Sequence, residues 1–261
     1  MSTPSKPSSA QAPWSDPAPL RLRIEMQVRS APRPSPHVLE TASIFGLGAD
    51  AEHRITVVPP TELVLAPRQL VFVTGPSGSG KSSILRRVRA TALEQAATVI
   101  DLDNFAHQDA TPQDGADDNA PLVDALPGGS LEKNLDWLGL AGLGDAFVML
   151  RTPQELSDGQ RRRFQLAHAF ARLQAELERG PSPLTPLLLA DEFAATLDRT
   201  TAMVLARSAR KLARRTPACF VVATSHDDLL EALDPDVLIS KGLGDEMHVL
   251  TRDPQSVGGD A

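Results

Sequence analysis

Residues 69–83 read QLVFVTGPSGSGKSS. The apolar run LVFVT is typical of a buried strand, and a glycine-rich loop that ends in a lysine follows it directly. This loop fits the pattern G-x-x-x-x-G-K-[ST], in which backbone N–H groups surround phosphate oxygens at the start of a helix. The sequence therefore predicts a phosphate-binding loop made of Gly75, Pro76, Ser77, Gly78, Ser79, Gly80, Lys81, Ser82 and Ser83.

Two side chains of this loop have specific expected roles. Lys81 would reach the β- and γ-phosphates of ATP with its positive charge, and the Ser82 hydroxyl would be a ligand of Mg²⁺. ATP and Mg²⁺ are therefore the expected substrate and cofactor. The alternative is a glycine-rich turn that precedes a lysine by chance. The strand before the loop and the helical spacing of residues 81–96 argue against it.

Strand and helix patterns alternate along the rest of the chain. Strand patterns occupy residues 20–28, 54–58, 62–65, 97–102, 186–190 and 219–223, and helical patterns occupy residues 81–96, 131–140, 160–179 and 199–215. This alternation predicts an α/β fold with a mostly parallel sheet that is covered on both faces.

Composition sets limits on the class of protein. The chain has 261 residues, 41% of them hydrophobic, which is enough for one sizeable core. The net charge of −7 argues against a broad nucleic-acid or anionic-membrane surface. The single cysteine, Cys219, excludes an intrachain disulfide and is expected in the core. No apolar stretch reaches the roughly 18–20 residues that cross a bilayer, so we expect a soluble, cytoplasmic chain without direct membrane insertion.

Acidic residues follow a second predicted strand. The run PLLLA at residues 186–190 leads directly into Asp191 and Glu192. In open α/β folds, ligands bind at the carboxyl ends of parallel strands. We expect Asp191 to hold Mg²⁺ through its water shell, and Glu192 to polarise the water that attacks the γ-phosphate. The sequence therefore predicts hydrolysis of ATP; an ordinary solvated strand end is the alternative.

Three more segments carry a resemblance to a known family. Residues 156–160, LSDGQ, resemble the LSGGQ signature of ABC-type ATPases, with Asp158 in place of its first glycine. Residues 195–198 (ATLD) are similar to the D-loop of that family, and residues 223–226 (ATSH) to its switch-histidine segment. The resemblance covers about residues 54–251. It implies a P-loop NTPase fold with an N-terminal antiparallel β part and a small helical subdomain at about residues 121–178.

The resemblance also implies a head-to-tail homodimer that sandwiches two ATP molecules. The signature residues Ser157, Asp158, Gly159 and Gln160 would then face the γ-phosphate bound by the partner chain. Asp198 would approach the partner's phosphate loop while it caps its own helix. His226 would contact the γ-phosphate and hold the attacking water. The alternative for Ser157 is a helix cap and nothing more.

Two expected features of the family are difficult to locate. Its members stack adenine on an upstream aromatic residue, usually tyrosine, and this chain has no tyrosine. Phe45 and His53 are the candidates. The family's glutamine loop is also unclear: Asp124 falls near that position, while Gln108 and Gln113 lie in a loop without periodicity.

The biological role has three candidate answers. The runs PLVDALPGGSLEKNL, ELSDGQRRR and ADEFAATLDRTTA resemble a soluble branch of ABC-type ATPases that is sometimes fused to a predicted acetyltransferase domain. Phe193 stands where transporter subunits usually have proline. The favoured hypothesis is a soluble ATP-driven switch that acts on an unidentified protein partner, with nucleic acid not expected. The alternative is the ATP-binding subunit of a transporter whose membrane chain is encoded separately. Glu192 and His226 argue against a third, non-hydrolysing regulatory module.

The remaining predictions concern the domain limits and surface features. Residues 1–19 are rich in Pro, Ser and Ala and predict a disordered tail, residues 20–254 form the ATPase domain, and residues 255–261 form a flexible C-terminus. The Pro-rich link at residues 179–186 predicts a surface insertion, and residues 161–163 (RRR) predict a solvated cationic patch.

Overall fold

A six-stranded sheet forms the centre of the structure, in the strand order β4-β5-β6-β3-β7-β8. The computed structural model describes residues 16–30, 33, 35–46, 53–102, 119–180 and 182–252. The first five strands in this order are parallel, and β8 pairs with β7 antiparallel. The expected, mostly parallel sheet is confirmed. The bounds are β3 (Leu70–Thr74), β4 (Val99–Asp101), β5 (Leu187–Ala190), β6 (Cys219–Ala223), β7 (Val237–Lys241) and β8 (Met247–Thr251).

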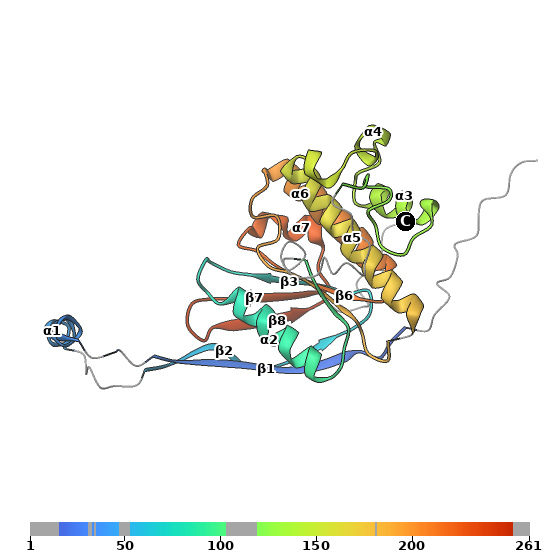
Figure 1. Ribbon diagram of the computed structural model, residues 1–261. Helices are drawn as coiled ribbons and strands as arrows, with labels where there is room; N and C mark the ends of the chain where they lie inside the picture. Colours follow the sequence, from blue (N-terminus) through green and yellow to red (C-terminus); the bar gives the residue numbers. More distant parts are fainter. Residues whose placement is uncertain are drawn as a thin grey trace, which may run out of the picture.

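Both faces of this sheet are covered, as Figure 1 shows. Successive side chains of a strand point to opposite faces, so Phe72 packs on the side of the long helices while Val71 and Val73 pack on the side of α2. Cys219 is fully buried, and burial raises the pKa of its thiol, as expected for a core cysteine. One face carries α5 (Asp158–Arg179), α6 (Arg199–Arg215) and α7 (Leu230–Leu233), and the other carries α2 (Lys81–Glu94) and a second sheet.

The second sheet is an antiparallel pair of long strands, β1 (Leu20–Ser30) and β2 (His53–Leu65). The sequence predicts two strands at residues 54–58 and 62–65, but the structure has one continuous strand through Pro59 and Pro60. Because β2 pairs only with β1, its other edge tolerates residues without an N–H group. The far end of the hairpin carries α1 (Pro36–Ile44), a helix that the sequence analysis does not predict.

A smaller core lies beside the main one. It is built around Leu122, Leu138 and Leu143 together with Phe164 from the first half of α5, while Phe170 further along α5 belongs to the main core. The elements here are α3 (Leu131–Leu140), α4 (Ala146–Met149) and a short 3₁₀ helix, Pro153–Glu155. Within the described ranges, no helix is long and apolar enough to cross a membrane.

The end of the predicted N-terminal tail is paired with the predicted surface link. The Ala18 N–H donates to the Pro183 carbonyl at 3.1 Å, and the Thr185 N–H donates to the Ala18 carbonyl at 2.8 Å. Thr185 is completely buried, and its hydroxyl also donates to the Ala18 carbonyl. Backbone hydrogen bonds thus order two segments whose apolar content is too low to reveal them. Residues 1–15 and 253–261 lie outside the described part of the chain.

An ion pair between a buried arginine and a half-buried aspartate joins three segments of the main core. The Arg210 guanidinium on α6 donates to both carboxylate oxygens of Asp236, at 2.5 and 2.8 Å. The Asp236 carboxylate also accepts the Leu70 N–H at the start of β3, at 2.8 Å. Burial alone would raise the pKa of Asp236, but the hydrogen bonds from Arg210 and Leu70 outweigh it and lower that pKa.

The substitution Asp236→Asn tests this joint. We expect it to lower the free energy of unfolding by about 3 kcal/mol, because the buried Arg210 guanidinium loses its two-bonded carboxylate and keeps only Asp234, at 3.7 Å. Asp228→Asn is the control, because Asp228 pairs with the exposed Arg199 and its loss is expected to cost less than about 1 kcal/mol. Urea unfolding measures both. The folded-state pKa of Asp236 is depressed, so the difference from wild type should be present near neutral pH and shrink below about pH 4. Equal effects of the two variants would contradict the prediction.

Candidate active site

The loop between β3 and α2 turns at three glycines. Their φ angles are 144° at Gly75, 77° at Gly78 and 106° at Gly80, a region that other residues rarely adopt. Space is limiting as well. A Cβ atom at Gly75 would lie 2.0 Å from the Lys241 carbonyl oxygen, and one at Gly80 would lie 2.8 Å from the Val57 side chain. The two outer glycines are therefore required by close packing and by backbone conformation.

Lys81 folds back over its own loop. Its side chain is largely buried, and its Nζ donates to the carbonyl oxygens of Gly75 at 2.8 Å and Pro76 at 3.0 Å. Ser82 follows in the first turn of α2 and is half-buried. The Ser79 hydroxyl is buried and has no hydrogen-bond partner among the described residues. The loop thus holds one cation and one unsatisfied hydroxyl close to a helix N-terminus.

Three neighbouring strands bring the other predicted groups to the same edge of the sheet. Strands β5, β6 and β3 are adjacent and parallel, with Ala190 opposite Val222 and Val73 opposite Ala223. Hydrogen-bonded strands lie about 4.8 Å apart. The segments that begin at Asp191, at Thr224 and at Gly75 therefore leave the sheet side by side.

A strained turn follows β5. Glu192 has a φ of 43° and Ala194 a φ of 61°, both in the left-handed region that non-glycine residues avoid. The Glu192 N–H donates to an Asp191 carboxylate oxygen at 3.0 Å. The Phe193 N–H donates to the Ala223 carbonyl at 2.8 Å, which anchors the turn to the end of β6. These bonds fix the direction of the two acids relative to the sheet edge.

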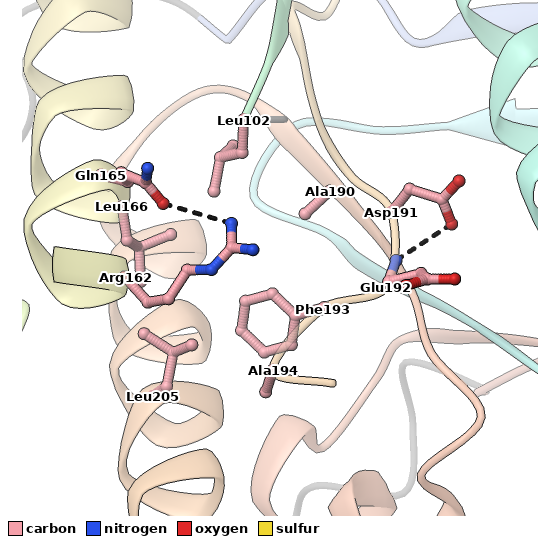
Figure 2. A pocket seen from close by; sticks show the side chains of 10 residues that line it. All are labelled: Leu102, Arg162, Gln165, Leu166, Ala190, Asp191, Glu192, Phe193, Ala194 and Leu205. Atoms are coloured by element: carbon pink, nitrogen blue, oxygen red, sulfur yellow. Dashed lines mark hydrogen bonds between the residues drawn. The ribbon is translucent and has the colours of Figure 1, made fainter. Parts of the chain in front are cut away.

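Figure 2 shows the result of this turn. The Phe193 ring points toward Arg162 and Leu205, and the Asp191 and Glu192 side chains point to the opposite side. Phe193 is buried, and its ring packs edge-on against Phe220 at a centroid distance of 6.1 Å. The cavity around it measures only about 20 Å³, close to the volume one water needs. The turn thus commits Phe193 to the core and directs the carboxylates out of it.

His226 is exposed and is the third residue after β6. Its N–H donates to the Thr224 hydroxyl at 3.3 Å. The next residue, Asp227, accepts a hydrogen bond from the hydroxyl of Thr74, which is the last residue of β3. The histidine segment, including the short 3₁₀ helix Asp227–Leu229, is therefore tied to the start of the phosphate loop.

The signature segment is the N-terminus of α5. The Ser157 hydroxyl accepts the Gln160 N–H at 3.4 Å, and the Gln160 side chain accepts the Ser157 N–H at 3.1 Å, which is a reciprocal capping box. Ser157 and Asp158 are exposed. A Cβ atom at Gly159 would lie 2.7 Å from the Thr201 methyl group, so α5 and α6 begin in close contact.

Asp198 caps α6, as the sequence predicts. Its carboxylate accepts the Thr201 N–H at 3.0 Å, and the hydrogen bonds from Thr201 lower the pKa of this exposed carboxyl group. Within one chain, the start of α5 lies well away from the start of α2, where Lys81 stands (Figure 1). The structure therefore groups the phosphate loop, Asp191, Glu192 and His226, and it keeps the signature residues apart from them.

Several sequence-based candidates are not brought to this site. Phe45 is 72% exposed and ends α1, at the tip of the β1–β2 hairpin and away from the start of α2 (Figure 1), so it is not placed to stack adenine. The backbone of His53 begins β2, but its side chain lies outside the described part of the structure. Asp124 is exposed in a turn, where its N–H donates to the Pro121 carbonyl. Gln108 and Gln113 fall outside the described residues.

Two features near the site differ from the sequence-based expectations. Arg163 is half-buried and donates to the Gly142 and Gly159 carbonyls, at 2.9 and 3.2 Å, so residues 161–163 are not simply a solvated patch. Lys241, which touches the phosphate loop, was missed. The signal that could have found it is a lysine that ends the apolar run VLIS, because a cation at the end of a buried strand needs partners.

Comparison with known proteins places the chain in a family. A family model described as an AAA domain matches residues 65–233. The hemin import ATP-binding protein HmuV of Rhodopseudomonas palustris is 32% identical over 70% of this chain and 73% of its own length. The lipoprotein-releasing system ATP-binding protein LolD of Maricaulis maris is 29% identical over 80% of this chain and 96% of its own length.

The fold also matches a solved structure. The ATP-binding cassette MJ0796, in a dimeric post-hydrolysis state bound to ADP and phosphate, superposes with a TM-score of 0.52 over 89% of this chain and 100% of that chain. The two sequences are 16% identical, so this likeness concerns the fold alone. The expected P-loop cassette fold is confirmed. Family model, relatives and fold agree: this chain belongs to the ATP-binding cassette family of P-loop ATPases.

Proposed function

We propose that this ATPase binds ATP–Mg²⁺ at the phosphate loop, hydrolyses it in a head-to-tail dimer, and serves as the ATP-binding subunit of a transport system. One observation carries the catalytic part: adjacent strands β5, β6 and β3 end in two acids, a histidine and the phosphate loop. The transport part rests on relatives named for lipoprotein release and hemin import.

The loop residues are suited to hold a polyphosphate. N–H groups at the start of α2 and the helix dipole favour an anion. Lys81 contributes an ammonium whose present acceptors, the carbonyls of Gly75 and Pro76, belong to the loop itself. Phosphate oxygens accept hydrogen bonds from an ammonium more strongly than neutral carbonyls do. The buried Ser79 hydroxyl gains a partner if a ligand fills the loop.

The donors near the loop also fit Mg²⁺. They are hard oxygen atoms: the Ser82 hydroxyl and the Asp191 carboxylate, with no cluster of three acidic, histidine or cysteine side chains among the described residues. Such sparse sets are typical of Mg²⁺ that is shared with a nucleotide, because the phosphates and water supply the other ligands. When bound, the ion neutralises charge on the β- and γ-phosphates. Holding it is the role we assign to Ser82 and Asp191.

Glu192 is the proposed general base. A water oxygen attacks the γ-phosphorus, the bond to the β-γ bridging oxygen breaks, and the Glu192 carboxylate accepts the proton of the water. ADP and phosphate leave. The left-handed turn supports this role, because it holds the Glu192 carboxylate out of the core while Asp191 accepts the Glu192 N–H. His226, tied to the loop through the Asp227–Thr74 hydrogen bond, is proposed to orient the water and the γ-phosphate.

The substitution Glu192→Gln tests the catalytic assignment. It keeps the shape of the side chain and removes the base, so we expect ATPase activity to fall by about 10²-fold or more. Binding of ATP should persist. In the presence of ATP–Mg²⁺ the variant should accumulate as a dimer, which light scattering detects. A variant that hydrolyses ATP at the wild-type rate would refute the role of Glu192.

The dimer proposal follows from what one chain lacks. The exposed N-terminus of α5 offers unpaired N–H groups, the Ser157 hydroxyl and a helix dipole, which together suit a phosphate. In one chain these groups lie away from Lys81 (Figure 1). We propose that they complete the site of a second copy. Asp158 then brings a carboxylate to a place where the family has glycine, and Asp198, beside the contact of Gly159 with Thr201, lies near the same interface.

Ser157→Ala, compared with Ser130→Ala, separates capping from catalysis. Both serines cap a helix and accept a backbone N–H at 3.4 Å, from Gln160 and Lys133 respectively. Each substitution should cost about 1 kcal/mol of stability. Only Ser157→Ala should weaken ATP-dependent dimerisation and ATPase activity, measured at a temperature where both variants are folded. An equal loss of activity would reduce Ser157 to a cap.

Mixing two inactive variants tests the composite site directly. A Lys81→Ala chain has an intact signature, and a chain with a damaging Ser157→Arg substitution has an intact phosphate loop. Their heterodimer contains one complete site, so the mixture should regain ATPase activity that neither variant shows alone. If each site were contained in one chain, mixing would restore nothing.

A soluble switch is the second candidate, favoured by Phe193 in the sequence. The structure gives Phe193 a packing role against Phe220, which weakens it as a marker of function. Exposed apolar side chains on the helical part, Leu131 (62%), Phe147 (80%) and Leu150 (68%), support a protein partner in either case. The resemblance to the branch fused to acetyltransferases stays a prediction.

The partner of the trapped Glu192→Gln dimer decides between these roles. The tagged variant is loaded with ATP–Mg²⁺ and recovered from detergent-solubilised extract of its own cells, with Lys81→Ala as the control that cannot bind ATP. We expect a polytopic membrane protein to be enriched in an ATP-dependent manner. Enrichment of soluble proteins alone would favour the switch.

A further inference from the structure

Lys241, the last residue of β7, is completely buried. Its Nζ donates to the carbonyl oxygens of Gly242 at 2.8 Å and Gly244 at 2.7 Å, within the turn that leads to β8. Lysine is almost never fully buried without partners, and none of the groups assigned above requires it. The buried Lys241 ammonium therefore has no role in the site as described so far.

Lys241 lies close to the phosphate loop at both of its outer glycines, Gly75 and Gly80. Ser240 pairs with Thr74, so Lys241 continues β7 beside Gly75, where β3 becomes the loop. The Lys241 carbonyl oxygen lies 2.0 Å from the position of a Cβ at Gly75, and its Cε lies 3.8 Å from that of a Cβ at Gly80. Backbone and side chain of Lys241 therefore support both ends of the glycine loop.

The surroundings of the Lys241 ammonium act on it in opposite directions. Burial lowers the pKa of Lys241, and the nearby carboxylates of Asp245 and Glu246 oppose this effect. Two carbonyl oxygens accept hydrogen bonds from it. Among the described residues, no carboxylate oxygen lies within 4.0 Å of the Lys241 Nζ. Two carboxylates thus act on the Lys241 charge from nearby without pairing directly with it.

The two hydrogen bonds of Lys241 hold the β7–β8 turn, but this role does not require a positive charge. A neutral donor could make the same two hydrogen bonds without the cost of burying a charge. A buried charge is, however, poorly screened by water and salt, so it acts on a nearby anion more strongly than a surface charge does. The anion that the proposed function brings to this loop is the polyphosphate of ATP.

We propose that Lys241 is a second cation of the phosphate site: a positioning residue that holds the β7–β8 turn under the loop and strengthens binding of the phosphates by its charge. This inference rests on the proposed binding of ATP at Gly75–Ser82. Lys81 is bonded to carbonyl groups of the loop itself, whereas Lys241 is bonded to carbonyl groups of the neighbouring β7–β8 turn, so the two cations are held by different segments.

Lys241→Met and Lys241→Arg test the role of the charge in the full chain. Methionine preserves the length and the packing, and arginine preserves the charge. We expect the dissociation constant for ATP–Mg²⁺, measured by calorimetry, to rise about tenfold in Lys241→Met and by less in Lys241→Arg. Loss of the hydrogen bonds to Gly242 and Gly244 should lower the melting temperature of Lys241→Met, so affinity is measured at a temperature where all variants are folded. Recovery of affinity in Lys241→Arg is the result that a merely structural role does not predict.

A second pair of variants leaves Lys241 in place. Glu246→Gln removes an exposed carboxylate that acts on Lys241, so ATP–Mg²⁺ should bind more tightly, by about two- to threefold at low salt. Glu231→Gln makes the same charge change on α7 and should alter affinity less. This pair tests the proposal even if the Lys241 variants do not fold.

Two results would overturn the inference alone. One is wild-type affinity in a folded Lys241→Met chain, and the other is equal affinity in Glu246→Gln and Glu231→Gln. A wild-type chain that binds no ATP–Mg²⁺ would instead overturn the proposed function and this inference with it. Loss of binding in Lys81→Ala serves as the reference for a disrupted phosphate loop.

Discussion

The placement of β3 between β6 and β7 is the constraint on which the rest of the structure depends. Parallel pairing on both sides puts the carboxyl end of β3, and so the start of the phosphate loop, beside two other strand ends. On one side, the neighbours β6 and β5 contribute His226, Asp191 and Glu192. On the other side, β7 contributes Lys241. A shift of register by one residue would turn the core side chains of β3 to the wrong face, so burial on both faces fixes the site geometry.

Strain near the site is offset by packing. Glu192 and Ala194 hold left-handed backbone angles that cost energy outside glycine. The turn persists because Phe193 is buried against Phe220 and its N–H is bonded to the end of β6. The same geometry directs the carboxylates of Asp191 and Glu192 outward. Core packing and the direction of the proposed base are therefore two consequences of one turn.

The signature segment and the Asp198 cap are joined inside each chain. The start of α5 packs on the start of α6 so closely that Gly159 has no room for a side chain beside Thr201. Asp198, which caps α6, accepts a hydrogen bond from that same Thr201. A displacement of the Ser157 end of α5 would thus be transmitted to Asp198 through the contact of Gly159 with Thr201. In the proposed dimer, the ATP of the partner chain would therefore face two segments that are already joined in this chain.

The features that the sequence alone determined depend on interactions between residues close together in the chain. The phosphate loop, the α5 and α6 helices and the Asp198 cap depend on glycine conformation, helical periodicity and capping, which act over a few residues. Three features could not be predicted, because they depend on contacts between remote segments. They are the single strand through Pro59 and Pro60, the pairing of Ala18 with Leu184, and the distance of Phe45 from the loop. The buried position of Lys241 beneath Gly75 is of the same kind. The sequence thus determined which chemical groups this ATPase carries, and only the tertiary structure decided which of them meet, because strand order and register bring distant residues to one edge of the sheet.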